Sequence, residues 1–99
     1  MVLIHVSVTT KDEAVNKFEP TLRSVVADAR QTAGCEKYEW YRVPDSGQGY
    51  VIYGEFDSKE NFERYQKSSV VKRIGEELIP LLIARPVFKH YDATVLESG

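Results

Sequence analysis

Residues 35–56, CEKYEWYRVPDSGQGYVIYGEF, decide the fold, because they contain two apolar segments separated by a turn. CEKYEWYRV and GYVIYGEF have the aromatic and β-branched content of strands, and PDSGQ between them is typical of a hairpin loop. Pairing the strands about this loop places Tyr38 opposite Gly54 and Trp40 opposite Ile52. The same face also carries Tyr50 and Phe56. This face of the hairpin is expected to be the buried one.

The segment before the hairpin predicts a strand and a helix. The alternation of side chains over residues 2–8 indicates a strand, and Thr10 with Glu13 three residues later resembles a capping box. A helix is therefore expected to start near Lys11, and Gly34 suits the left-handed position that closes such a helix. Pro20 lies inside it, and a proline there costs roughly 3 kcal/mol, so a kink or a restart is expected.

The segment after the hairpin predicts a second helical region and a last strand. Ser58 can cap a helix whose apolar stripe continues towards Pro86, and Gly75 and Pro80 are expected to break it into two pieces. VFKHYDATV, residues 87–95, is the closing strand. The order β-α-β-β-α-β predicts an α+β, ferredoxin-like fold, in which both helices cover one face of a four-stranded antiparallel sheet.

Composition limits the classes of partner. The 99 residues contain no linker or repeat, which predicts a single domain over residues 1–99. A formal charge of -2 offers no basic surface to nucleic acid or to a membrane, and no apolar run approaches the ~20 residues that span a bilayer. A cytoplasmic protein is expected. Cys35 is the only cysteine and no metal-ligand spacing occurs, so neither a metal nor a cofactor is expected.

The opposite face of the hairpin is not polar enough to lie in water. Tyr41, Val51 and Tyr53 share it with three charged residues, Lys37, Glu39 and Glu55. Two tyrosines and a valine in contact with solvent would form an exposed apolar patch. A homodimer that packs sheet against sheet is therefore expected.

Three segments of the chain resemble the antibiotic biosynthesis monooxygenase domains, a branch of the dimeric α+β barrel superfamily. AGCEKYEW, residues 33–40, is similar to the family's glycine-cysteine-x-x-tyrosine strand. YVIYGEFDSKENFERY, residues 50–65, and KSSVV, residues 67–71, follow in the family's order, the latter like its serine-proline-histidine turn. The resemblance covers nearly the whole chain and implies a homodimer with a small pocket between sheet and helices in each subunit.

The resemblance also implies a range of activities. Members include cofactor-independent oxygenases that convert phenolic polyketides to quinones, haem-degrading enzymes, isomerases of a phosphorylated quorum-sensing signal, and proteins without known activity. In the cofactor-independent oxygenases, deprotonation of a phenol or enol gives an electron-rich anion that reacts with oxygen. Such a site needs a base, a hydrogen-bond donor and a dry aromatic cavity.

The chain departs from the family pattern at three positions. The family's strand glutamate aligns with Gly54, its helix histidine with Tyr65, and the second histidine of its turn with Val70. A glycine on the strand leaves room for a larger side chain from the helix above. Tyr65 is therefore expected to lean into the space over Gly54.

His5 and Tyr65 are the candidate catalytic residues. Tyr65 offers a phenolic donor or, with a lowered pKa, a base; packing in the core is the alternative. His5 is the preferred general base, because imidazole titrates near neutral pH and the first strand borders the family's pocket. If His5 faces the partner sheet, it is structural, and His90 on the last strand has the same ambiguity. The candidate substrate-binding residues are Tyr38, Trp40, Ile52, Gly54, Phe56 and Phe62.

Two classes of function remain open. The first is a cofactor-independent enzyme of secondary metabolism acting on a small aromatic or enolisable substrate, as a monooxygenase of the antibiotic biosynthesis type or as an isomerase or cyclase. The second is a non-catalytic dimeric module that binds a small apolar ligand or serves in assembly. Haem degradation is disfavoured, because neither His5 nor His90 lies on the helix that carries the axial histidine of the haem-degrading members.

Overall fold

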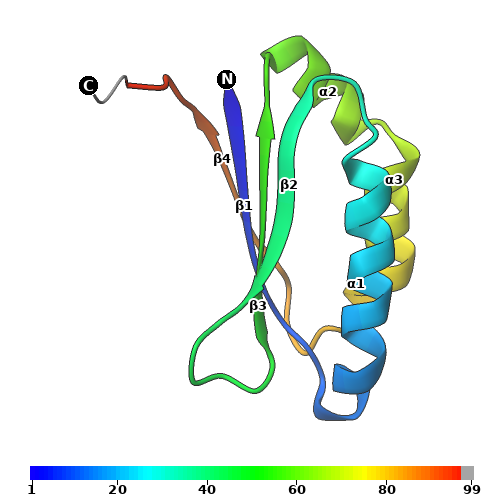
Figure 1. The fold of residues 1–99 in the computed structure, drawn as a ribbon. Coiled ribbons are helices and arrows are strands. Elements are labelled where there is room, and N and C mark those ends of the chain that lie inside the picture. Colours follow the sequence, from blue (N-terminus) through cyan, green and yellow to red (C-terminus); the bar gives the residue numbers. More distant parts are fainter. Residues whose placement is uncertain (97–99) are drawn as a thin grey trace.

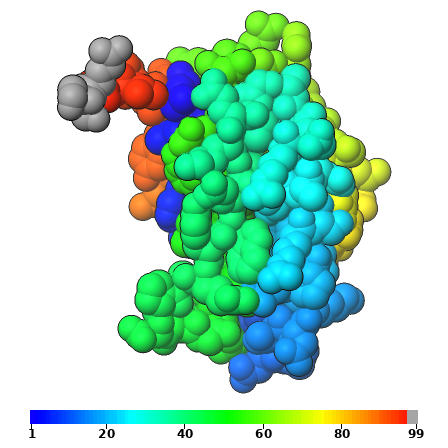
Figure 2. Space-filling model, in the orientation of Figure 1, coloured from blue at the N-terminus to red at the C-terminus, as the bar shows by residue number. Residues whose placement is uncertain are grey.

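The hairpin of residues 35–56 is present in the computed structural model, which describes residues 1–96 of the chain. β2 (Cys35–Arg42) and β3 (Gly49–Phe56) pair antiparallel, with Tyr38 opposite Gly54 and Trp40 opposite Ile52. This register confirms the prediction. The connecting loop contains Asp45 in a left-handed conformation, at φ 63°, and projects beyond the end of the sheet (Figures 1 and 2).

The described residues form one antiparallel sheet of four strands in the order β2-β3-β1-β4. β1 (Val2–Thr9) lies in the middle, paired with β3 on one side and with β4 (Val87–Asp92) on the other. Burial alternates along β1, because its even-numbered side chains face the helices and its odd-numbered ones face away. The last strand is shorter than the predicted 87–95.

The helices cover one face of this sheet and leave the other open (Figure 1). α1 (Val15–Ala29) follows a short 3₁₀ turn, η1 (Asp12–Ala14). The second helical region consists of α2 (Lys59–Gln66), α3 (Ser69–Arg73), the π-helix η2 (Ile74–Leu78) and the 3₁₀ helix η3 (Ile79–Leu81). The predicted ferredoxin-like α+β fold is therefore confirmed. None of the helices within residues 1–96 is long and apolar enough to cross a membrane.

The start of α1 differs from the prediction. Thr10 forms no capping box with Glu13, because it pairs with Leu82 in an isolated bridge and its hydroxyl donates to the carbonyl of Lys11. Its backbone N–H is also used, in a hydrogen bond to the carbonyl of Gln48. Tertiary contacts thus hold Thr10 in the sheet layer, and the α-helix begins only at Val15.

Pro20 neither ends nor restarts α1, which is one helix from Val15 to Ala29. Pro20 is exposed on its outer side, while the opposite stripe is buried against the sheet. That stripe is Phe18, Leu22, Val25, Val26 and Ala29. Packing of five buried residues therefore offsets the hydrogen bond that the proline removes. Gly34 has the predicted left-handed conformation, at φ 75°, but it lies in the turn after the helix, whose C-cap is Arg30.

The second helical region breaks earlier than predicted. Ser58 caps α2 as expected, since its hydroxyl oxygen accepts a hydrogen bond from the Asn61 N–H at 3.2 Å. The break lies at Ser68, whose N–H and hydroxyl both donate to the carbonyl of Tyr65. Gly75 does not break the region but lies within the π-helix, and Pro80 lies in the first turn of η3.

Candidate active site

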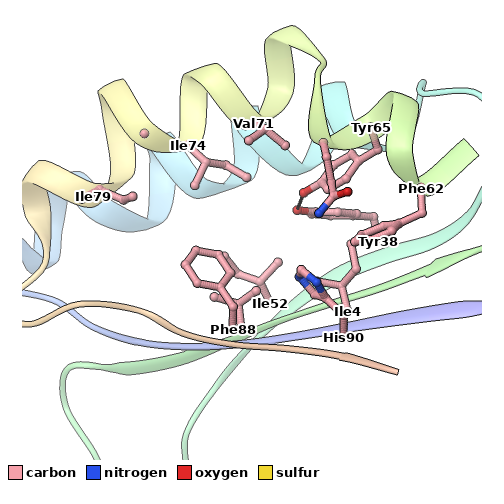
Figure 3. Close-up of a pocket in the computed structure, with 13 residues that line it drawn as sticks. Ile4, Tyr38, Ile52, Phe62, Tyr65, Val71, Ile74, Ile79, Phe88 and His90 are labelled. Atoms are coloured by element: carbon pink, nitrogen blue, oxygen red, sulfur yellow. Dashed lines mark hydrogen bonds between the residues drawn. The ribbon is translucent and has the colours of Figure 1, made fainter. Parts of the chain in front are cut away.

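A cavity of about 320 Å³ lies between the inner face of the sheet and the second helical region (Figure 3). The strands contribute Ile4, Val6, Tyr38, Ile52, Phe88 and His90 to its wall. The helical region contributes Phe62, Tyr65, Gln66, Val71, Ile74, Gly75 and Ile79. Its volume is at the lower end of the ~300–1,000 Å³ typical of small-molecule sites, which suits a compound of one or two rings.

Polar groups gather at one end of this cavity. The hydroxyl oxygens of Tyr38 and Tyr65 lie 2.5 Å apart in a hydrogen bond, and the imidazole of His90 lies at the same end (Figure 3). Ile74, Ile79 and Phe88 surround the other end. A ligand that fits this distribution has one polar group and an apolar body.

The position of Tyr38 depends on Gly54, its partner across the hairpin. A Cβ atom on Gly54 would lie 3.0 Å and 3.2 Å from two carbons of the Tyr38 ring. The ring therefore covers the glycine directly. The expectation that Tyr65 fills this space is wrong in its choice of residue, because the side-chain atoms nearest to the Gly54 Cβ position belong to the cross-strand Tyr38, and Tyr65 meets Tyr38 through its hydroxyl.

Tyr65 is held by aromatic neighbours on both sides of the helix–sheet interface. Its ring centroid lies 4.8 Å from that of Phe56 on β3 and 6.2 Å from that of Phe62, one turn earlier on α2. Only 6% of Tyr65 is exposed. These contacts fix the ring and direct its hydroxyl towards Tyr38 (Figure 3).

Both phenols are neutral at physiological pH. Burial raises the pKa of Tyr65 to about 12, although the hydrogen bond from Tyr38 acts in the opposite direction. Burial raises the pKa of Tyr38 as well, and the adjacent Tyr65 adds to the effect. Tyr65 would need a lowered pKa to act as a base, and its pKa is raised instead. A neutral phenol can still donate a hydrogen bond.

His90 lies at the opening of the cavity. It is opposite Ile4 in the β1–β4 pairing and therefore shares the inner face of the sheet. Its ring stands edge-on to Phe62, with centroids 4.9 Å apart. His90, Phe62 and Gln66 also border a neighbouring surface depression, so this side of the cavity connects to solvent.

The other predicted catalytic residue, His5, does not line this cavity. Its neighbours Ile4 and Val6 do, and because side chains alternate along β1, His5 lies on the open face between Tyr53 and Lys89. A catalytic role for His5 stays a prediction, and it would require a ligand on that face. The sequence left open whether His5 or His90 faces the pocket. The sheet register places His90, and not His5, on the same face as the cavity.

The substrate-binding candidates divide into two groups. Tyr38, Ile52 and Phe62 line the cavity. Trp40, Gly54 and Phe56 do not: Phe56 is fully buried in the core, and Trp40 packs beside Tyr50 with the guanidinium groups of Arg23 and Arg42 each 5.6 Å from its ring. A direct role of these three in binding stays a prediction, although Gly54 makes room for Tyr38.

Several lining residues were missed by sequence reasoning. Phe88 shares a face with His90 by simple alternation along β4, so the strand pattern contained this signal. Val71 and Ile74 were recognised as an apolar helical stripe, but spacing alone does not separate a residue beside a cavity from one in a filled core. Within residues 1–96, no group of three or more His, Cys, Asp or Glu residues is placed to hold a metal ion.

Comparison with models of protein families identifies the family of this chain. The model of the antibiotic biosynthesis monooxygenase family matches residues 1–77. The chain belongs to this family. A comparison with curated proteins finds no significant match.

Solved structures support the same fold. A crystal structure of an antibiotic biosynthesis monooxygenase gives a TM-score of 0.85 at 17% identity, over 96% of this chain and 100% of the other. A protein from Deinococcus radiodurans described as belonging to this class gives 0.87 at 18% identity, over 99% and 97%. The Mycobacterium tuberculosis protein Rv0793 gives 0.86 at 16% identity, over 98% of each chain. At these identities, the likeness establishes the fold.

The three residues at which this chain departs from the pattern of the antibiotic biosynthesis monooxygenase family can now be placed in the structure. Gly54 lies beneath the Tyr38 ring, and Tyr65 places its hydroxyl in the cavity wall. Val70 is buried in the core, beside the cavity-lining Val71. The chain therefore carries a phenol pair in the region where the resemblance leads one to expect a glutamate and a histidine.

Proposed function

We propose that this chain is a cofactor-independent enzyme that acts on a small aromatic or enolisable compound of secondary metabolism. The observation that carries the proposal is the cavity of about 320 Å³ whose polar groups, from Tyr38, Tyr65 and His90, gather at one end (Figure 3). Membership of the antibiotic biosynthesis monooxygenase family supports oxygenation as the reaction.

The arrangement suits proton removal from a substrate. Among the described residues, His90 is the histidine that lines the cavity, and imidazole is the side chain that most often serves as a general base. In the proposed step, His90 takes a proton from carbon or oxygen of the substrate, and the electron pair moves onto a substrate oxygen. Tyr65 donates a hydrogen bond to that oxygen and stabilises its charge.

The resulting anion has two possible fates, which define the monooxygenase and the isomerase forms of the proposal. In a monooxygenase, the anion supplies electrons to molecular oxygen: a CH₂ group of the substrate loses both hydrogens and gains one oxygen atom as a carbonyl, and the second oxygen atom leaves with those two hydrogens as water. In an isomerase or cyclase, the proton returns from His90 to a different atom and oxygen takes no part. In either case the anion forms among mostly apolar side chains, beside the side of the cavity that connects to solvent.

We further propose that the chain works as a homodimer joined through the open face of the sheet. This face carries Tyr41, Val87 and Tyr91, which are 49%, 55% and 47% exposed in the single chain. Their neighbour Tyr53 donates a hydrogen bond to Glu55 at 2.5 Å, so these two polar groups of the face are already paired within the sheet. A second copy of the sheet would cover these aromatic and aliphatic groups.

A non-catalytic binding module is the second candidate. It is favoured by Gly54 and Tyr65, which replace the acid and the histidine that the resemblance implies, and by the neutral state of both phenols. In this case, the cavity would hold an apolar ligand without changing it.

The two candidates are separated by measuring binding and turnover on the same variants. Phenols, anthrones and small enolisable ketones are screened by thermal unfolding; a compound at 100 times its Kd stabilises the protein by about 2.7 kcal/mol. Oxygen consumption and product formation are then followed for the compounds that bind. His90→Gln tests the base, and His5→Gln is the matched control on the open face.

The enzyme proposal expects turnover that His90→Gln lowers by about 10²- to 10⁴-fold, the usual contribution of a general base, while His5→Gln retains it. Binding without turnover by any compound would favour the module instead. Turnover that survives in His90→Gln but not in His5→Gln would move the reaction to the open face and contradict the assignment of this cavity.

A further inference from the structure

The hydroxyls of Tyr38 and Tyr65 leave one proton without a protein acceptor. Each phenol carries one O–H donor, and a hydrogen bond between two hydroxyls uses only one of the two protons. Within residues 1–96, neither hydroxyl makes a second hydrogen bond. Tyr38 and Tyr65 are 2% and 6% exposed and both line the cavity, so the cavity is where a further acceptor can reach the pair.

Leaving such a donor unused is unfavourable in an apolar enclosure. The surroundings of the pair are mostly apolar, formed by the rings of Phe56 and Phe62 and by Val71 and Ile74, and the polar side chains of Gln66 and His90 also line the cavity. A buried hydroxyl that loses water without gaining a partner is destabilising, so the arrangement gains from a ligand atom that accepts a hydrogen bond.

The hydrogen bond between the two phenols makes the remaining O–H a stronger donor. When one phenol donates to the other, the remaining O–H is polarised, and hydrogen bonds in such chains reinforce one another by roughly 10–30% each. The two residues come from β2 and α2 and are fixed by Gly54 beneath one ring and Phe56 beside the other. The positions of the two hydroxyl oxygens are therefore set by the packed sheet and helix.

We propose that Tyr38 and Tyr65 form a linked donor pair that binds a carbonyl oxygen of the ligand, so that the cavity selects neutral ketones over the corresponding hydrocarbons. The inference rests on the proposed function only in taking this cavity as the ligand site. The functional group recognised is a carbonyl, and the residues that recognise it are Tyr38 and Tyr65. The apolar end, formed by Ile74, Ile79 and Phe88, receives the carbon skeleton.

The state of the two phenols supports a neutral acceptor as the preferred group. With the pKa of Tyr65 raised to about 12 and that of Tyr38 also raised, the pair remains protonated and continues to donate throughout the neutral range. A carboxylate or phenolate would bring a charge into an apolar wall, whereas a carbonyl oxygen brings only an acceptor.

The test compares 1-tetralone with tetralin, which share a two-ring skeleton and differ in one carbonyl group. The Kd of each is measured by calorimetry for the wild type, Tyr38→Phe, Tyr65→Phe and the double variant. The carbonyl stretching band of bound tetralone is recorded by infrared spectroscopy, because it reports the hydrogen bond directly. Phe88→Leu is the control that alters the apolar end of the cavity wall without removing a donor.

The wild type is expected to bind tetralone roughly 2- to 10-fold more tightly than tetralin, which corresponds to one neutral hydrogen bond. The double variant is expected to bind both equally, with the carbonyl band moved to the position found in apolar solvent. Phe88→Leu is expected to change both affinities together and keep their ratio. Both replacements in the double variant preserve the ring shape, so the folded state is retained, which the unfolding curve verifies.

Two results would overturn the inference while leaving the cavity as a ligand site: equal binding of the two compounds by the wild type, or a preference and a shifted carbonyl band that persist in the double variant. Failure of both compounds to bind would overturn the inference and the proposed function together. The outcomes are therefore distinguishable.

Discussion

At the residue scale, Tyr38 and Tyr65 depend on each other for a buried hydrogen bond of 2.5 Å. Removing one hydroxyl leaves the other without its partner, which is expected to cost about 1–3 kcal/mol. Removing both leaves two phenylalanines of the same shape and is expected to be nearly neutral. Urea unfolding gives the free energy of unfolding of the two single variants and the double variant. If the loss in the double variant equalled the sum of the losses in the single variants, the shared hydrogen bond would be contradicted.

Gly54 is the second residue on which the site depends. Because a Cβ there would lie 3.0 Å from the Tyr38 ring, Gly54→Ala is expected to destabilise the protein by about 1–3 kcal/mol through displacement of that ring. Gly75→Ala is the control, since a Cβ at that position meets nothing within 4 Å and the change is expected to be neutral or stabilising. Equal unfolding free energies for the two variants would argue against close packing over Gly54.

At the element scale, Glu19 joins α1 to β2 through a two-point interaction with Arg42. The hydrogen bond from Arg42 holds the pKa of Glu19 below its usual value. A carboxyl whose folded-state pKa is depressed contributes stability above its unfolded pKa of about 4.3 and loses it as the pH falls through the folded value. Glu19→Gln is therefore expected to lower the Tm at pH 7, and the difference should shrink towards zero in acid.

Glu63→Gln provides the comparison, since Glu63 forms no ion pair within the described residues. Its Tm difference from the wild type should be small and independent of pH. A pH-independent effect of Glu19→Gln would contradict the ionic origin of the link between α1 and β2.

The elements that sequence predicted best are those fixed by local chemistry. The hairpin register followed from the loop and the alternation on either side of it, and Ser58 caps α2 because its side chain needs only the next turn of its own chain. Thr10 was misassigned because Leu82 and Gln48, both far away in sequence, hold it in the sheet layer. The π-helix around Gly75 had no local signal that spacing rules could detect.

The site was predictable to a similar extent. Tyr65 and Tyr38 were identified as candidates from the sequence. Their mutual hydrogen bond depends on how β2 packs against α2, which the local sequence of neither segment predicts. The choice between His5 and His90 required the β1–β4 register, which pairs His90 with Ile4 and leaves His5 on the opposite face. Sequence spacing therefore supplied the residue types, and tertiary packing decided which of them share a cavity.

At the scale of the whole molecule, the open face of the sheet predicts a dimer. Val51 lies on this face between Ser7 and Tyr41, so Val51→Lys is expected to place a charge in the sheet-to-sheet interface and to shift the protein from dimer to monomer. Ile83→Lys is the matched control, because Ile83 is 65% exposed and lies outside the strands. Sedimentation velocity distinguishes the species; a monomeric wild type at micromolar concentration would contradict the proposed interface.

The most direct test of the account is an NMR titration of the ¹⁵N-labelled protein with 1-tetralone, because it locates the ligand without requiring turnover. The account predicts that the largest shift changes occur at the cavity wall, at Gln66, Ile74, Phe88 and His90. Amide signals on the open face, such as that of Tyr53, should change little. Changes centred on the open face, or none at all at saturating ligand, would contradict the claim that the cavity between sheet and helices is the functional site.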